Sequence, residues 1–483
     1  MRSTLLFIRV SSALCALLGA VALTAPAGAL GASPPTGNHQ PVVALGSLSQ
    51  LSGSSGCLVD RSQPRRGCTR VRALKGPGAF LGSHALAISP DGRNVYVAAS
   101  KSHAIAIFSR DARTGALSQR SGKAGCIATG HGGGCASAVG LLVPNSVAVS
   151  PDGRNVYATS VASNAVLSFH RDRSTGALKQ LGGGAGCITN ATAPGCVVGR
   201  ALDGPDSITV SPDGKNVYVV AFTGSSVAVF TRNPSTGALT QPSDSTGCLV
   251  ETATAGCTTG LALSNPEGVA VSPDDANVYV AAPGSDAVDS FARNSSTGAL
   301  TQATDGTGCI VGTALAGCTT GIQLAGADAL AVSPTGANVY VTSLVSNSVT
   351  AFTRATSTGQ LTQLTGTSAC VINVLAVGCS LGRKLSGPEG LAVSPDGASL
   401  YATAFVSGAL DVFNRNADSG AVTQKSRRPG CLVGSITPGC LPGRELRGAS
   451  SVAVSPDGRN VYSASLNSNA VSSFRRVTRS MTH

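Results

Sequence analysis

The sequence predicts an all-β protein, a seven-bladed β-propeller whose four-stranded antiparallel blades close into one ring. The first observation is a string of the form Ser-Pro-(Asp/Thr)-(Gly/Asp) followed by (Val/Leu)-Tyr, which recurs every 61 residues. Its serine lies at Ser89, Ser150, Ser211, Ser272, Ser333, Ser394 and Ser455. The second is the alternation of apolar and polar residues on both sides of each string, which is typical of strands. The third is that the two chain ends are complementary parts of one repeat. Repeats of this kind share one core and predict a closed ring.

Residues 1–29 are predicted to be a secretory signal peptide. Arg2 and Arg9 give a positive start, residues 10–25 are apolar, and Ala27-Gly28-Ala29 fits a small-x-small cleavage site. An uncleaved N-terminal anchor is the alternative. Residues 30–43 are rich in Pro and Gly and are expected to be a flexible lead-in. No later run is long and apolar enough to span a bilayer after signal removal. We therefore expect a secreted protein that is extracellular or associated with the cell envelope.

One repeat, residues 265–302, contains four short strand patterns separated by turn residues. The predicted strands are 269–272, 277–282, 287–293 and 299–302, and the predicted turns are 273–275, 284–286 and 294–298. The second turn carries a residue type that tolerates left-handed backbone in nearly every repeat. These residues are His103, Asn164, Ser225, Asp286, Asn347, Gly408 and Asn469. The remaining ~20 residues of each repeat are expected to form a loop to the next blade.

The two chain ends predict how the ring closes. The repeats start with a lone fourth strand at 46–50 and stop after a third strand at 470–475. The N-terminal strand should therefore join the last blade, so that no sheet edge stays open at the seam. The predicted propeller spans 44–476, followed by a polar tail at 477–483.

The aromatic residues are expected to form the core between blades. All seven Tyr hold one second-strand position and seven of the eleven Phe hold one third-strand position. Little aromatic surface remains for stacking bases, so we expect no nucleic-acid partner. An arginine ends every third strand, at Arg110, Arg171, Arg232, Arg293, Arg354, Arg415 and Arg476. These arginines are interpreted either as solvated strand ends or as blade-to-blade pairs.

Fourteen of the fifteen cysteines form seven regularly spaced pairs, one in each connecting segment. In an exported chain this pattern predicts disulfides, and no His shares the spacing that a metal site needs. The predicted bridges are Cys57–Cys68, Cys126–Cys135, Cys187–Cys196, Cys248–Cys257, Cys309–Cys318, Cys370–Cys379 and Cys431–Cys440. Seven closed loops on one face would form a crown that suits a protein or polymer partner.

Charge is distributed unevenly around the predicted ring. The formal net charge is +12, with basic residues concentrated in 57–75 and 425–447, whereas 233–353 holds nine acids and one base. A basic sector of this kind can orient the molecule on an anionic cell-envelope polymer. Drift after duplication with a solubility role explains it equally well. We expect a monomer.

The residue just before each predicted first strand differs from repeat to repeat. These residues are His84, Asn145, Asp206, Glu267, Asp328, Glu389 and Ser450. We name them the axial ring, because first strands line the axis of a propeller. They can cap the turn and meet only water, bind a ligand or a hard cation such as Ca²⁺, or include a general base. The catalytic candidates are Glu267, Glu389 and His84, and no cofactor other than calcium is indicated.

The Pro-Asp-Gly-x-x-(Val/Leu)-Tyr-Val-(Ala/Thr) string, followed by Ser-Asn-x-Val and Phe, resembles the YVTN-type repeat. The chain also resembles the seven-bladed lactonase family, which includes 6-phosphogluconolactonase-like and carboxymuconate-cyclase-like proteins. This resemblance implies a lactone hydrolase with its site at the mouth of the central channel. Pro144-Asn145, Pro266-Glu267 and Pro388-Glu389, with Pro205-Asp206, are similar to the calcium ligands of six-bladed gluconolactonase and paraoxonase propellers. The cysteine pairs depart from cytoplasmic lactonases, and no Arg/His cluster maps onto a lactonase active site.

Three functions therefore remain open. The favoured hypothesis is a secreted binding module that presents the disulfide-closed loops, since six of the seven Cys spacings are identical. The alternative is a lactone hydrolase at the channel mouth, which the individual residues of the axial ring favour. A structural repeat protein without a ligand is the third. Metal binding by the axial ring is open in the same way.

Overall fold

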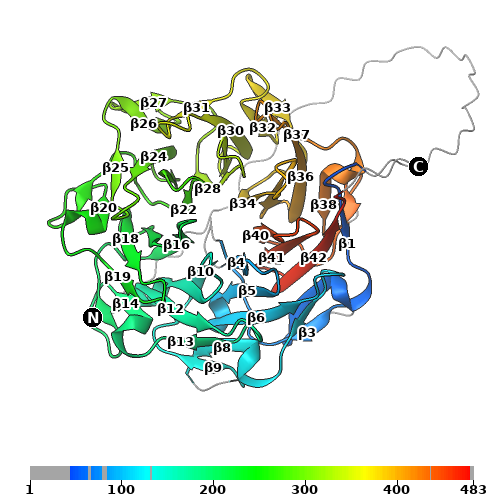
Figure 1. The fold of residues 1–483 in the computed structure, drawn as a ribbon. Helices are drawn as coiled ribbons and strands as arrows, with labels where there is room; N and C mark the ends of the chain where they lie inside the picture. Colours follow the sequence, from blue (N-terminus) through cyan, green and yellow to red (C-terminus); the bar gives the residue numbers. More distant parts are fainter. Residues whose placement is uncertain (1–43, 64–66, 79–83, 131–132, 436, 479–483) are drawn as a thin grey trace, which may run out of the picture. The chain divides into compact units, whose positions relative to one another are not determined.

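Seven sheets follow one another along the chain, and the innermost strand of each contacts that of the next until β40 meets β4 (Figure 1). This computed structural model describes residues 44–63, 67–78, 84–130, 133–435 and 437–478. The predicted signal peptide, the lead-in and the last residues of the tail lie outside the described residues. The predicted seven-bladed all-β fold is confirmed.

The three inner strands of each sheet form an antiparallel meander. The first strands are β4 Leu86–Ile88, β10 Pro144–Val149, β16 Pro205–Val210, β22 Gly268–Val271, β28 Ala327–Val332, β34 Pro388–Val393 and β40 Ala449–Val454. The second strands are β5 Asn94–Ala99, β11 Asn155–Ser160, β17 Asn216–Ala221, β23 Asn277–Ala282, β29 Asn338–Ser343, β35 Ser399–Ala404 and β41 Asn460–Ser465. The third strands are β6 Ala104–Arg110, β12 Ala165–Arg171, β18 Ser226–Arg232, β24 Ala287–Arg293, β30 Ser348–Arg354, β36 Ala409–Arg415 and β42 Ala470–Arg476.

Two strands share the outer edge of every third strand. The predicted fourth strand pairs with one end of it, and a strand that starts at or near the first cysteine pairs with the other end. The fourth strands are β1 Leu48–Gln50, β7 Leu117–Gln119, β13 Leu178–Gln180, β19 Leu239–Thr240, β25 Leu300–Gln302, β31 Leu361–Gln363 and β37 Val422–Gln424. The first cysteine strands are β2 Cys57–Asp60, β8 Cys126–Thr129, β14 Cys187–Thr189, β20 Cys248–Val250, β26 Gly306–Val311, β32 Cys370–Ile372 and β38 Cys431–Val433.

A sixth strand runs parallel to each first cysteine strand and forms the outermost edge of the sheet. These strands are β3 Thr69–Val71, β9 Ala136–Ala138, β15 Val197–Val198, β21 Thr258–Thr259, β27 Cys318–Thr320, β33 Cys379–Leu381 and β39 Leu441–Pro442. Short 3₁₀ turns occur at η1 Gly53–Gly56, η2 Ser100–Ser102, η3 Gly122–Gly125, η4 Val161–Ser163, η5 Gly183–Gly186, η6 Ser245–Gly247 and η7 Arg428–Gly430. The cysteine segments are therefore edge strands joined by short turns, where the sequence predicted connecting loops.

The ring closes as the chain ends predicted. β1 pairs antiparallel with β42, with Leu48 opposite Arg476 and Gln50 opposite Phe474. β2 pairs with the other half of β42, so the last sheet is completed by residues from the start of the described chain. No helix among the described residues is long and apolar enough to cross a membrane.

The Ser-Pro-Asp-Gly string makes the tight turn between first and second strands. In the second repeat, Ser150 Oγ donates to Asp152 Oδ1 (2.6 Å) and accepts from the backbone N–H of Asn155 (3.0 Å). Gly153 has φ +68°, the left-handed region that glycine adopts without strain. The turn places the Asp152 carboxylate where it forms an ion pair with Arg232 of the next blade.

A buried arginine joins each blade to its neighbour, as the second interpretation of these residues predicted. Arg232 is 3% exposed; its guanidinium donates to Tyr157 Oη (2.8 Å) and forms an ion pair with Asp152 (2.7 Å). The tyrosine in turn donates to Gly237 O (2.8 Å), in the strand-3-to-strand-4 turn of the arginine's own sheet. The seven tyrosines and the seven in-register phenylalanines are fully buried, which confirms that they form the inter-blade core.

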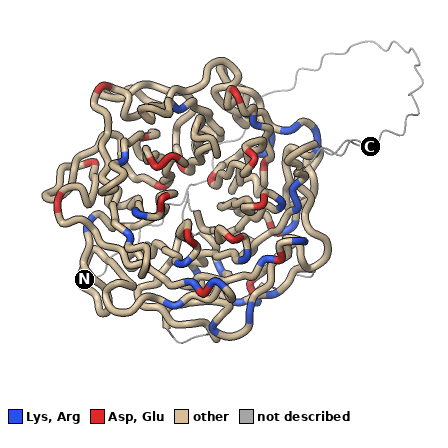
Figure 2. Tube along the Cα trace, viewed as in Figure 1, with Lys and Arg blue, Asp and Glu red and all other residues tan. Residues whose placement is uncertain are grey.

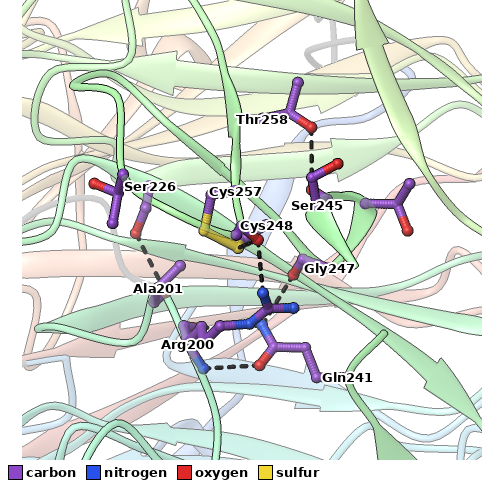
Figure 3. Close-up of a disulfide and its surroundings, with 12 residues drawn as sticks. Arg200, Ala201, Ser226, Gln241, Ser245, Gly247, Cys248, Cys257 and Thr258 are labelled. Carbon is purple, nitrogen blue, oxygen red and sulfur yellow. Dashed lines mark hydrogen bonds between the residues drawn. A yellow bond between two sulfur atoms is a disulfide. The ribbon is translucent and has the colours of Figure 1, made fainter. Parts of the chain in front are cut away.

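The structure contains all seven predicted disulfides. Figure 3 shows Cys248–Cys257 and the glutamine that binds beside it. The side chain of Gln241 accepts from the backbone N–H of Arg200 (2.7 Å) in the preceding segment and donates to Gly247 O (2.9 Å). The same residue ends or follows every fourth strand, so each cysteine segment is fixed to its neighbour by backbone-directed hydrogen bonds.

Candidate functional site

The axial ring lies at the start of the innermost strands. In six of the seven sheets, a side chain from the second turn of the preceding sheet accepts a hydrogen bond from a backbone N–H that precedes the axial position. Asn164 Oδ1 accepts from the backbone N–H of Gly204 (2.8 Å), two residues before Asp206. Asn347 Oδ1 makes the same contact with Gly387 N–H (2.8 Å), before Glu389. All seven residues at this turn position have positive φ, between 42° and 58°, which confirms their predicted role in the turn.

Six of the seven axial-ring residues are buried. Their exposed fractions are 0% for Asn145, 3% for Asp206, 5% for Glu267, 0% for Asp328, 1% for Glu389 and 0% for Ser450. His84 keeps part of its surface exposed, although its imidazole lies deep enough for desolvation to lower its pKa. This burial argues against the interpretation in which these side chains meet only water.

One side of the ring carries an imidazole and hydroxyl groups. His84 Nδ1 lies 3.1 Å from Ser207 Oγ, a contact between the sheets that begin with β4 and β16. Ser146, in the sheet between them, donates to His84 O (3.3 Å) and accepts from Ile208 N–H (3.3 Å). Burial lowers the pKa of His84, so the imidazole is neutral at neutral pH and able to accept a proton.

Four successive sheets carry a carboxyl group at the axial position: Asp206, Glu267, Asp328 and Glu389. Asp206 directly precedes Ser207 on β16, so the carboxyl groups begin beside the His84 contact. Glycine follows both glutamates because the inner strands approach closely there. A Cβ at Gly268 would lie 2.4 Å from Asp328 O, and one at Gly390 would lie 2.8 Å from Ser450 O. The tight packing brings the carboxyl groups into the same small region around the axis.

Burial raises the pKa of every one of these four carboxyl groups. The pKa of Glu267 rises to about 8, and burial together with the Glu267 carboxylate raises the pKa of Asp206 well above its usual range. Burial and then the carboxylates of Glu267 and Glu389 do the same for Asp328. At neutral pH the group therefore holds protons that it can donate.

Several polar atoms in this group have no protein partner among the described residues. Asp206 Oδ1 accepts from Asn145 Nδ2 (2.9 Å). Both carboxyl oxygens of Asp328 and Oε1 of Glu389, by contrast, are buried without a hydrogen bond. Buried polar atoms of this kind are costly, and at functional sites they await water or a ligand.

The side chains of the axial ring are also the candidates for the predicted calcium site. Among the described residues, no group of three or more His, Cys, Asp or Glu side chains is arranged to hold a metal ion. Protonated carboxyl groups are also poor ligands for a hard cation. Calcium binding stays a prediction, and no chemical step is derived through it.

Ser207 was not predicted from the sequence as a partner of His84. The signal was present, since the residue after the axial position is Ala85, Ser146, Ser207, Gly268, Ala329, Gly390 and Ser451. A hydroxyl is therefore available in only three sheets. The sequence does not show in which direction the His84 side chain points. In the structure it extends past the neighbouring sheet and contacts the sheet after it.

Residues 203–315 match the sequence model of the family described as Lactonase, 7-bladed beta-propeller. The predicted resemblance to this family is confirmed over that segment, which includes Asp206 and Glu267. A search of curated proteins found no match.

Solved propellers are similar in fold. A candidate 6-phosphogluconolactonase from Bacteroides uniformis is 19% identical, covers 77% of this chain and 88% of its own, and has a TM-score of 0.51. Hydrazine synthase from Kuenenia stuttgartiensis is 17% identical, with coverage of 83% and 98% and a TM-score of 0.51. A periplasmic gluconolactonase from Pseudomonas aeruginosa is 19% identical, with coverage of 83% and 96% and a TM-score of 0.49. At such identities the similarity establishes the fold alone, since one propeller fold carries unrelated functions.

Proposed function

We propose that the protein hydrolyses lactones at the axial ring. The observation that carries this proposal is the asymmetry of the ring, which combines a neutral His84 in contact with Ser207 and a run of carboxyl groups that hold protons. A base and an acid with separated pKa values are the pair that acid–base hydrolysis needs near neutral pH. The match of residues 203–315 to the lactonase family supports the substrate class.

The proposed reaction uses only residues of this chain and one water. His84 takes a proton from the water as its oxygen attacks the lactone carbonyl carbon. The bond between the acyl carbon and the ring oxygen then breaks, and Glu267 donates its proton to that oxygen, which leaves as a hydroxyl. The product is the open-chain hydroxy acid, and solvent returns the proton from His84 to Glu267. Ser207 holds the imidazole in position.

The test is hydrolysis of a panel of γ- and δ-lactones by the mature protein, with calcium and with a chelator. We expect turnover in both conditions and a loss of kcat/KM of at least about 100-fold in Glu267→Gln and in His84→Gln. Glu251→Gln is the matched control, because it makes the same chemical change outside the axial ring. Absence of turnover on every lactone by the folded wild-type protein would overturn the proposal. Turnover that requires calcium would instead place a metal in the reaction.

The binding function predicted from the cysteine segments is the second candidate. The observation that favours it is the basic side of the ring near β1, β3 and β38, whereas acidic residues gather around the inner strands (Figure 2). Salt-sensitive co-sedimentation with a soluble polyanion such as heparin, by a protein that hydrolyses no lactone, would favour this candidate over the first.

A further inference from the structure

A pocket of about 310 Å³ lies between the first two disulfide-closed segments. Its walls come from the end of β2, the link that follows β3, the turn at η2 and the second disulfide segment after β8. None of the residues that line it belongs to the axial ring. The pocket therefore lies outside the site proposed for hydrolysis, at the junction where the ring closes.

Cations dominate the lining. Arg61, Arg72, Lys75 and Lys101 line the pocket with a single acid, Asp60. That acid is already engaged: Asp60 is 3% exposed, and Oδ1 accepts from Ser62 Oγ (2.6 Å) while Oδ2 accepts from Leu74 N–H (3.1 Å). These hydrogen bonds of Asp60 fix the wall of the pocket. Among the described residues, the Asp60 carboxylate forms no ion pair with the four cations.

The cations of the pocket differ in whether their donors already form hydrogen bonds. The Arg72 guanidinium donates only to backbone carbonyls, including Arg120 O (3.0 Å) and Gly122 O (3.1 Å), so its charge meets no carboxylate in the described part of the chain. The ammonium groups of Lys75 and Lys101 are exposed and make no hydrogen bond or ion pair with any described residue. Arg72 therefore contributes its positive charge to the pocket, and the lysine ammonium groups contribute free donors.

The position of Arg72 is also an arginine at Arg200, Arg383 and Arg444, and the position of Lys75 is Arg447 in the last repeat, but the other two cations occur at this junction alone. The positions that correspond to Lys101 are Ala162, Thr223, Gly284, Val345, Val406 and Asn467. The positions that correspond to Arg61 are Gly130, Ala191, Thr252, Thr313, Val374 and Ser435. None of these residues is a cation. A charge placed for solubility alone would have no reason to gather at one of seven equivalent junctions.

We propose that this pocket binds the phosphate or sulfate group of a small polar ligand, no larger than a monosaccharide ester. The Arg61 guanidinium donates to no described residue, and with the two ammonium groups it forms the donor set that proteins use for tetrahedral dianions. The only apolar side chains in the lining, apart from the disulfide, are Ala73 and Ala128, so the rest of the ligand must be polar. The volume lies at the lower end of the range for small-molecule sites.

The experiment is calorimetric titration of the full mature protein with inorganic phosphate, sulfate, pyrophosphate and a hexose 6-phosphate at low ionic strength. We expect the dianions to bind, the sugar phosphate to bind at least as tightly as free phosphate, and the affinity to fall as salt screens the site. In Lys75→Ala/Lys101→Ala the affinity should fall by at least about tenfold.

The matched control is Lys179→Ala/Lys215→Ala, which removes the same charge from sheets outside the pocket. It should bind as the wild type does, and the thermal unfolding of both double variants should match the wild type. Equal loss in the two double variants would mean attraction by net charge alone and would overturn the proposal, as would wild-type affinity in Lys75→Ala/Lys101→Ala. Lactone hydrolysis is measured in the same samples and should stay unchanged, so failure of one proposal is distinguishable from failure of the other.

Discussion

The sheet-to-sheet junctions and the axial ring are built from the same repeat. Their carboxyl groups nevertheless differ, since the pKa is lowered at the junctions and raised at the axis. At a junction, partial burial raises the pKa of Asp152, but hydrogen bonds from Ser150, the Arg154 backbone and Arg232 outweigh it and keep the pKa below its ordinary value. At the axis, burial raises the pKa of Glu267 and nothing opposes it. The charges at the junctions form ion pairs that hold the ring together. The axial carboxyl groups form no ion pair with a described residue, and carboxyl groups with raised pKa values are typical of functional sites.

Breaking a junction should have the largest effect on stability. We expect Arg232→Met to lower the free energy of unfolding by about 3 kcal/mol, since removing one partner of a buried ion pair strands the other groups that it satisfied. These groups are Asp152, Asn155 and Tyr157. Urea unfolding of the oxidised protein measures the change.

Arg173→Met is the control, because Arg173 is exposed in the turn that follows β12, and exposed substitutions change stability by at most about 0.5 kcal/mol. An unchanged unfolding midpoint in Arg232→Met would contradict the structural role of these arginines.

Neutralising the axis should change stability in the opposite direction, by an amount that depends on pH. Because the folded state raises the pKa of Glu267 to about 8, folding is favoured while the group is protonated. Its contribution is fully present below the pKa of the unfolded chain and is lost as pH rises through the folded value. Glu267→Gln should therefore be more stable than the wild type by on the order of 2 kcal/mol at pH ~6. The difference should be small near pH ~4 and should grow until the pH passes ~8.

Thermal unfolding of the two proteins across this pH range tests the prediction. Asp418→Asn, which neutralises an exposed carboxylate outside the axial ring, should follow the wild-type curve. Parallel curves for Glu267→Gln and the wild type would show that Glu267 ionises normally, and the acid assigned to the hydrolysis would be lost with it.

The repeat made most of the fold predictable. A 61-residue spacing with seven Tyr and seven Phe in register specifies the blade number, and the lone strand at 46–50 specifies the closure. The outer strands were missed because two or three residues such as Thr258–Thr259 carry too little alternation to be distinguished from a loop. Their pairing depends on the Gln241-type contacts, which join residues 41 positions apart.

The axial ring was located by sequence, but its arrangement was not. Position in the repeat places His84 and Asp206 at the axis, since first strands line it. Whether His84 contacts Ser146 or Ser207 depends on side-chain direction across a closed ring, which no spacing encodes. Likewise the burial of Asp328 follows from the close approach at Gly268, a packing effect between separate sheets.

One junction departs from the rule and offers the smallest and most specific test. Arg415 donates to Tyr340 Oη (2.6 Å) and Asn338 Oδ1 (2.6 Å), but Thr335 stands where the other six junctions have an aspartate. Its contact with Ser333 Oγ is 3.4 Å, whereas the equivalent contact of Asp152 is 2.6 Å. A buried guanidinium without a carboxylate is therefore a local weakness in the ring.

Thr335→Asp should repair this junction and raise the free energy of unfolding by about 1 kcal/mol, since the carboxylates at the other junctions are partly exposed and screened. The gain should shrink at high salt, which a thermal unfolding series in sodium chloride measures. Thr335→Asn supplies the hydrogen bonds without the charge and should recover less than half of the gain. If aspartate and asparagine stabilise equally, the ion pair contributes nothing at these junctions, and the hydrogen bonds of the turn alone account for the contrast with the axis.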